Sequence, residues 1–172
     1  MSVKPILTEP NKLLRQISKP VEQVGDEERA LMDDMLETMY EAPGIGLAAI
    51  QIGVPKRIIV MDISRDEDKK EPRYFVNPVI KNSNKEKVKY EEGCLSVPDQ
   101  FAEIERPNAC EVEYLDYDGK KKLLKADGLL ATCIQHEMDH LEGILFIDYL
   151  SKLKRSMIIK KLSKNKVNRE IF

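Results

Sequence analysis

Both histidines of this 172-residue chain, His136 and His140, lie in the five-residue string His136-Glu137-Met138-Asp139-His140. Residues four apart share one face of an α-helix, with Cβ atoms about 5–6 Å apart, so both imidazoles can bind one metal ion. Glu137 projects roughly 100° further around the helix, where its carboxylate can accept a proton from a metal-bound water. The string therefore predicts a metal-dependent hydrolase; the alternative is a chance match on a polar helix with solvated histidines.

The residues around this string predict a buried helix over 128–142. Asp127 is a good N-cap, and Gly143 is a good residue to follow the last turn. One apolar stripe is formed by Leu130, Ile134, Met138 and Leu141. A helix that is apolar around most of its circumference is usually buried. Two imidazoles and a carboxylate are costly to bury without partners, and a bound cation would remove that cost.

The rest of the pattern predicts an α+β fold, with antiparallel strands packed around the metal-binding helix and further helices near both ends. One helix is expected to be capped by Asp26 and ended by Pro43-Gly44, and another to begin at Ser151. A turn at Asp118-Gly119 predicts a hairpin. Apolar or alternating runs predict short strands at 57–61, 74–76, 110–117 and 120–125. We expect residues 1–172 to form a single catalytic domain.

Net charge and cysteine content restrict the partners and the location. The net charge of −2 argues against nucleic-acid binding by the molecule as a whole, and we expect no direct DNA binding. From Ser151 onward, however, eight Lys or Arg residues accompany a single acid, Glu170. This basic segment is either a solvated helix end or a docking surface for an anionic partner such as RNA.

The three cysteines show no paired spacing, and the sequence contains no apolar signal segment or membrane-spanning run. We therefore expect a cytoplasmic protein with no membrane contact.

A catalytic divalent ion usually has three protein ligands, so a third is needed beside His136 and His140. Cys133 shares their helical face but lies about 10 Å along the axis from His140, so we expect it to line the neighbouring pocket wall. Cys94 is the better candidate, because the tight, polar loop over 91–98 would expose its thiol. Packing as a small apolar residue is the alternative for Cys94.

A second loop, Gly44–Gln51, contains two glycines that would let its backbone lie against an extended ligand. Gln51 offers a neutral amide donor, which suits an oxyanion that develops beside a metal. The Gly-x-Gly pattern alone is weak. It lacks the third glycine and the preceding strand of a dinucleotide site, so a simple tight loop is the default interpretation.

Taken together, three segments resemble the signature motifs of peptide deformylases in order and spacing: Gly44–Gln51, Glu92–Ser96 and Gln135–His140. The resemblance covers nearly the whole chain, and it includes Glu105–Pro107, Ala126–Leu130 and Leu141–Phe146. It implies hydrolysis of the formyl group from the N-terminal formyl-methionine of nascent peptides, with release of formate.

The resemblance also implies catalytic roles. A ferrous ion, with zinc or nickel as substitutes, would be bound by Cys94, His136 and His140. The ligand types alone do not distinguish iron from zinc. Glu137 would take a proton from the metal-activated water and return it to the leaving amine. The side chain of Gln51 and the backbone N–H of Leu95 would hold the oxyanion.

Substrate contacts follow from the same resemblance. The peptide backbone would pair in strand-like fashion with Ile45, Gly46 and Gly93. The methionine side chain would enter an apolar pocket near Thr132 and Cys133. Some relatives carry arginine where this chain has Phe101, so contacts beyond the methionine are not carried over. Some bacterial relatives dock on ribosomes through a C-terminal helix, which makes the basic segment 151–172 a candidate ribosome contact.

Two functions of other kinds remain open at this point. A small zinc endopeptidase could use the same helix, with Asp148 or Glu170 as its third ligand. A non-catalytic metal-binding or ribosome-associated module could also carry the motif. Assays with a formyl-methionyl dipeptide and with casein would separate the two enzymes, and substitution of Glu137 would leave the module unaffected.

Overall fold

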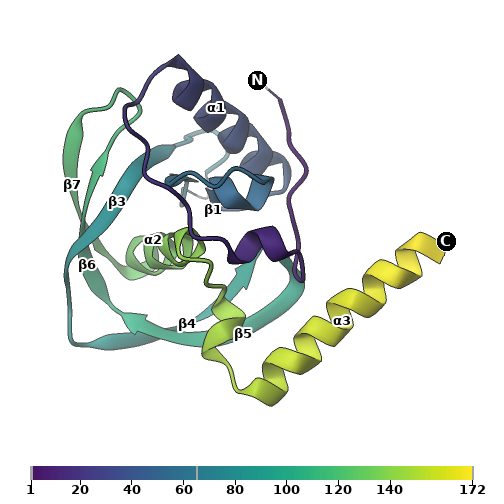
Figure 1. Cartoon of the computed structure of the whole chain (residues 1–172). Helices are drawn as coiled ribbons and strands as arrows, with labels where there is room; N and C mark the ends of the chain where they lie inside the picture. The colour runs from purple at the N-terminus through teal and green to yellow at the C-terminus, as the bar shows by residue number, and fades with distance from the viewer. Residues whose placement is uncertain (1, 65, 172) are drawn as a thin grey trace.

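The computed structural model describes residues 2–64 and 66–171. Within these residues, helix α2 lies between a five-stranded antiparallel sheet, in the order β1-β2-β3-β6-β7, and a two-stranded sheet, β4-β5 (Figure 1). The α+β architecture predicted from the sequence is confirmed. The strands are β1 (Gly46–Ala48), β2 (Ile58–Met61), β3 (Arg73–Ser83), β4 (Lys87–Cys94), β5 (Val97–Pro107), β6 (Ala109–Leu115) and β7 (Lys121–Asp127). The helices are α1 (Asp26–Glu41), α2 (Gly128–Leu141) and α3 (Lys152–Ile171), with short 3₁₀ helices η1 (Lys12–Arg15), η2 (Ala49–Ile52) and η3 (Phe146–Tyr149).

Helix α2 begins and ends close to where the sequence predicts. Asp127 occupies the N-cap position, although its side chain makes no capping hydrogen bond. Gly143 has φ +74°, the left-handed conformation expected after the last helical turn. The helix contacts β1, β2, β6 and β7 of the larger sheet as well as β5 of the smaller one. Its residues therefore face both sheets, which accounts for their apolar character.

Helix α1 covers the other face of the larger sheet. The buried side chains of Met32, Met35 and Met39 pack against β1 and β2, as their spacing predicts. The N-cap is Gly25 and not Asp26, so the predicted start is wrong by one residue. The Gly25 N–H donates to the carboxylate of Glu28 at 2.9 Å, which satisfies one of the free donors of the first turn.

Strands β4 and β5 were not predicted. The segment around Cys94 was expected to be a loop, but Cys94 is the last residue of β4, and only Leu95 and Ser96 separate it from β5. Exposed and partly buried positions alternate along Lys87–Glu91, and many of these positions carry charges. Apolar and polar residues therefore alternate only weakly along the sequence. The hairpin lies at the surface and buries only part of each inward side chain.

Helix α3 packs beside β5, where Leu162 is buried together with Phe146 and Ile147. Figure 1 shows that it projects away from the five-stranded sheet. Its start at Lys152 agrees with the predicted helix. Within the described ranges, no helix combines the length and the apolar character needed to cross a membrane.

Candidate metal centre

Cys94, His136 and His140 come together in the structure. Each offers one ligand atom, and these atoms all lie within 4.8 Å of one another. The two histidines lie one turn apart on α2, while Cys94 reaches them from the end of β4, with its Sγ 3.3 Å from Nε2 of His140. His140 is fully buried and His136 is 8% exposed. Among the described residues, this is the one group of three or more side chains arranged to hold a metal ion.

The surroundings of the two imidazoles fit a divalent cation. Nδ1 of His136 lies 2.9 Å from the Glu92 carboxylate, which orients the ring and leaves Nε2 free. Burial alone would lower the pKa of His136, but contacts with Cys94 and Glu92 raise it well above its usual value. The site thus favours positive charge at this ring, and a metal ion would meet the same preference. Burial lowers the pKa of His140 well below its usual value, which keeps that ligand neutral.

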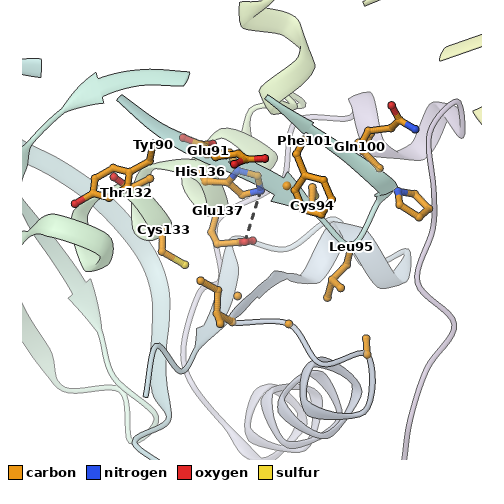
Figure 2. A pocket seen from close by; sticks show the side chains of 18 of the residues that line it. Tyr90, Glu91, Cys94, Leu95, Gln100, Phe101, Thr132, Cys133, His136 and Glu137 are labelled. Atoms are coloured by element: carbon orange, nitrogen blue, oxygen red, sulfur yellow. Dashed lines mark hydrogen bonds and ion pairs between the residues drawn. The ribbon is translucent and has the colours of Figure 1, made fainter. Parts of the chain in front are cut away.

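Glu137 lies beside these ligands. Its Oε1 is 3.9 Å from Nε2 of His136, the contact drawn as a dashed line in Figure 2. The side chain is buried, and among the described residues Oε2 has no hydrogen-bond partner. Burial raises the pKa of Glu137 to about 7. A carboxyl group with this pKa can both accept and release a proton near neutral pH.

Gln51 and Leu95 lie next to the ligands, on η2 and in the turn after β4. The Gln51 side chain is held at both ends: its Oε1 accepts from the Ala48 N–H at 2.9 Å, and its Nε2 donates to Ser96 Oγ at 3.0 Å. Nε2 also lies 3.5 Å from Cys94 Sγ. The amide donor of Gln51 therefore faces the space where the ligand atoms meet.

A pocket of about 530 Å³ opens onto this centre. The residues that the sequence suggested for substrate binding all line it: Ile45, Gly46, Gly93, Thr132 and Cys133. In Figure 2, Thr132 and Cys133 lie beside Tyr90 on one side of Glu137, and Phe101, Gln100 and Leu95 lie on the other. Phe101 is 65% exposed, and its ring covers Gly93, where an added Cβ would be 2.6 Å from it.

Sequence reasoning missed an ion-pair network behind His136. The buried guanidinium of Arg106 donates to both Glu92 oxygens, at 2.7 and 3.0 Å, and to Asp139 at 2.8 Å. Tyr149 also donates to Asp139, at 2.7 Å. This network holds the carboxylate that orients His136. The signal in the sequence was its place in Glu105–Pro107, one of the segments that resemble the family, and that resemblance does not reveal which residues Arg106 pairs with.

Asp148, one of the two candidates for the third ligand of a zinc endopeptidase, does not join the two histidines. Its carboxylate pairs with Arg15 at 2.6 Å and with Arg155 at 3.4 Å. Glu170, the other candidate, has a side chain outside the part of the molecule that is described.

Comparison with known proteins shows which family the chain belongs to. A family model described as polypeptide deformylase matches residues 3–156. The chain belongs to the polypeptide deformylase family. The peptide deformylase of Pelagibacter ubique (strain HTCC1062) is 90% identical over 171 residues, which cover 99% of each chain. That of Rhizobium meliloti (strain 1021) is 57% identical over 164 residues, or 95% of this chain and 94% of that one.

Solved deformylase structures share the fold. A crystal structure of the enzyme from Ehrlichia chaffeensis superposes with a TM-score of 0.91 at 46% identity, covering 96% of this chain and 97% of that one. A structure of the Ehrlichia enzyme in complex with actinonin gives the same TM-score at 49% identity, covering 96% and 98%.

Family membership decides between the functions considered above. The protein is a hydrolase and a metalloenzyme that acts on nascent formylated peptides, as the motifs predict. The endopeptidase and the non-catalytic module are not supported by these comparisons.

Proposed function

We propose that the pocket at the end of β4 is the deformylation site, with Cys94, His136 and His140 as metal ligands and Glu137 as general base. The observation that supports this most strongly is the convergence of three ligand atoms beside a buried carboxylate, 3.9 Å from one ligand ring. A divalent ion held there supplies Lewis acidity, which polarises a carbonyl oxygen and acidifies water.

Glu137 moves the proton in this proposal. Its carboxylate accepts a proton from the attacking water and delivers it to the amine that leaves when the formyl carbon–nitrogen bond breaks. A pKa of about 7, raised by burial, suits both transfers. The absence of a hydrogen-bond partner at Oε2 leaves that oxygen available for the water proton.

The oxyanion that forms on the formyl oxygen needs donors on the side of the pocket away from Glu137. We assign these to the backbone N–H of Leu95 and the amide of Gln51. Of the two hydrogens on Nε2, one is used by Ser96 Oγ, and the other lies on the side of Cys94 Sγ at 3.5 Å. This second hydrogen is the one available to a substrate oxygen that lies beside Cys94, with the Ser96 contact kept.

The substrate enters as an extended chain. We assign backbone pairing to Ile45, Gly46 and Gly93, which all line the pocket. The methionine side chain then occupies the part of the pocket next to Thr132 and Cys133, both buried on α2. A flexible thioether side chain suits this mixed surface, because it adapts to irregular apolar space.

Substitution of the base tests the mechanism directly. Glu137→Ala should lower kcat for a formyl-methionyl peptide by about 10²–10⁴-fold, the contribution of a positioned general base, while the bound metal is retained. Glu142→Gln, at the C-cap of the same helix, is the matched control, because Glu142 is exposed and pairs with Arg57. Equal activity of the Glu137 variant and wild type would refute the assignment of the base.

We propose a ferrous ion as the native metal. The thiolate and two imidazoles suit Fe²⁺, Zn²⁺ and Ni²⁺ alike, so the assignment of iron comes from the family resemblance. Metal analysis of protein purified without oxygen, with activity measured for each reconstituted ion, tests it. Iron predicts rapid loss of activity in air, whereas full and stable activity with zinc alone would contradict it.

Two further assignments are proposals. Free cysteines at 94, 110 and 133 suit the reducing cytoplasm, where nascent chains are made.

The basic residues of α3 are proposed to contact the ribosome. Truncation after Leu150 would remove Leu162 from the apolar cluster, so reversal of the exposed charges at Lys160 and Lys161 is a better test. Unchanged co-sedimentation with ribosomes would refute this contact.

A further inference from the structure

The N-terminal segment makes hydrogen bonds to three parts of the chain that lie next to the metal centre: η2, the turn after β4 and the end of α2. We call residues Leu7–Ser18 the N-terminal clamp. In Figure 1 the purple N-terminal chain first passes α1; the clamp follows and contains the short helix η1, near the end of α2. No residue of the clamp lines the pocket, and the mechanism proposed above does not use it.

Two backbone hydrogen bonds join the clamp to the segments that carry the proposed oxyanion donors. The Leu7 N–H donates to the Gln51 carbonyl at 2.7 Å, and the Glu9 N–H donates to the Ser96 carbonyl at 2.8 Å. Gln51 and Ser96 are also joined to each other through their side chains at 3.0 Å. The clamp therefore closes a ring of contacts around the turn that follows Cys94.

Arg15 connects this ring to the end of α2. Its guanidinium donates to the Glu9 carboxylate at 3.1 Å, to Asp148 at 2.6 Å and to the Gly143 carbonyl at 3.3 Å. The backbone carbonyl of Arg15 also lies against Gly143, where a side chain would have no room. Nearby, the Ser18 N–H donates to the Leu141 carbonyl at 2.8 Å, so the clamp satisfies one of the carbonyls that the helix end leaves free.

The hairpin that carries Cys94 needs such a connection. Strands β4 and β5 pair with each other and, among the described strands, with no strand of the larger sheet. The position of Cys94 relative to the histidines of α2 is therefore not set by sheet hydrogen bonds. It depends on the Arg106 ion pairs, on apolar packing, and on the clamp.

We propose that Arg15 is a positioning residue: by tying Glu9 to the end of α2, it holds the Leu95–Ser96 turn so that Cys94 stays within bonding range of the metal held by His140. This proposal rests on the proposed function, because it takes Cys94 and His140 as ligands. Arg15 acts through Glu9 and Gly143 and does not touch the reacting atoms.

The test compares Arg15→Ala with Arg155→Ala. Both arginines pair with Asp148, but Arg155 comes from α3, and within the described ranges it forms an ion pair with Asp148 alone. The variants are loaded with Co²⁺, whose thiolate charge-transfer absorption reports the bond to Cys94, and metal release to a chelator is timed. For Arg15→Ala we expect the metal to be released about 10-fold faster than from wild type, or more. This is the effect of losing a residue that holds a metal ligand in place. We also expect a weaker thiolate band. We expect kcat to fall and KM to stay near the wild-type value.

The outcomes are separable. Arg155→Ala should keep the wild-type band and release rate even if its melting temperature falls as far as that of Arg15→Ala. A wild-type band and release rate in folded Arg15→Ala would overturn the clamp proposal. Absence of the thiolate band from the wild-type protein would instead refute the ligand assignment of the proposed function. If Arg15→Ala does not fold, Arg15→Lys and Glu9→Gln provide the same comparison, because each weakens the link and leaves most packing in place.

Discussion

The backbone of Gly46 packs directly against the carboxylate of Glu137, so that a Cβ on Gly46 would lie 2.7 Å from Oε1. Strand β1 thereby forms one wall of the space that holds the proposed general base. The close approach gives a physical reason for glycine at this position, because every other side chain would push the carboxylate away from the metal centre.

Gly46→Ala should therefore impair catalysis without loss of the metal. A displacement of the base by about 1 Å can lower kcat about 100-fold, while Cys94, His136 and His140 remain in place. Steady-state kinetics together with metal analysis measure both effects. Gly25→Ala is the control, because a Cβ there meets its nearest neighbour, Glu28, at an ordinary 3.4 Å. Loss of metal from Gly46→Ala would contradict this explanation.

Arg106→Met should destabilise the fold strongly. The substitution leaves Glu92 buried without its charged partner, and the removal of one member of a buried ion pair costs about 3–5 kcal/mol. Urea unfolding measures the change. The double variant Arg106→Met/Glu92→Gln should recover part of the loss, because it removes the unpaired charge. Arg29→Met, which breaks an ion pair with the exposed Asp26, should change the unfolding midpoint little.

Metal removal should lower the thermal stability of the wild-type protein. A ligand that binds only the folded state stabilises it by about 2.7 kcal/mol at 100 times its Kd, and this gain disappears on chelation. Thermal melts with and without a chelator measure the difference. Cys94→Ala should show a much smaller difference, whereas Cys110→Ala, in the apolar cluster between α2 and the larger sheet, should keep it. Equal responses of the two variants would exclude Cys94 as a ligand.

Tyr149 should give stability a pH dependence in the alkaline range. Burial and the hydrogen bond to Asp139 raise the pKa of Tyr149 to about 12, compared with about 10 in an unfolded chain. The folded state keeps this proton longer, so the stabilisation is complete below about pH 10 and is lost as the pH rises towards about 12. Unfolding free energies measured from about pH 9 to about pH 11 should fall less steeply for Tyr149→Phe than for wild type. If the two proteins lose unfolding free energy equally with rising pH, the folded state does not raise the pKa of the Tyr149 hydroxyl.

Local patterns predicted the elements whose signals lie close together in the chain. Helix α2 has an N-cap position, a glycine after its last turn and apolar residues around most of its surface, and these mark its ends and its burial. The β6–β7 hairpin was predicted from its turn residues in the same way. Strands β4 and β5 escaped prediction because their charged, half-buried residues show little alternation in hydropathy.

Contacts between distant residues were not predictable from local patterns. Arg106 reaches Glu92 across the hairpin and Asp139 on α2, 14 and 33 residues away in sequence. Arg15 reaches Gly143 and Asp148, 128 and 133 residues away. A charged side chain in a surface pattern gives no indication of which partner it meets, because many carboxylates are equally compatible with it.

The sequence alone determined the chemistry that is available: two imidazoles one helical turn apart with a carboxylate between them, a thiol in a second motif and an amide in a third. Helical geometry makes the first of these a local property. Only the tertiary structure decided that Cys94 lies 3.3 Å from His140, 46 residues away, and that burial brings the pKa of Glu137 to about 7. Both depend on which distant residues exclude water from the pocket, and packing across the whole chain decides that.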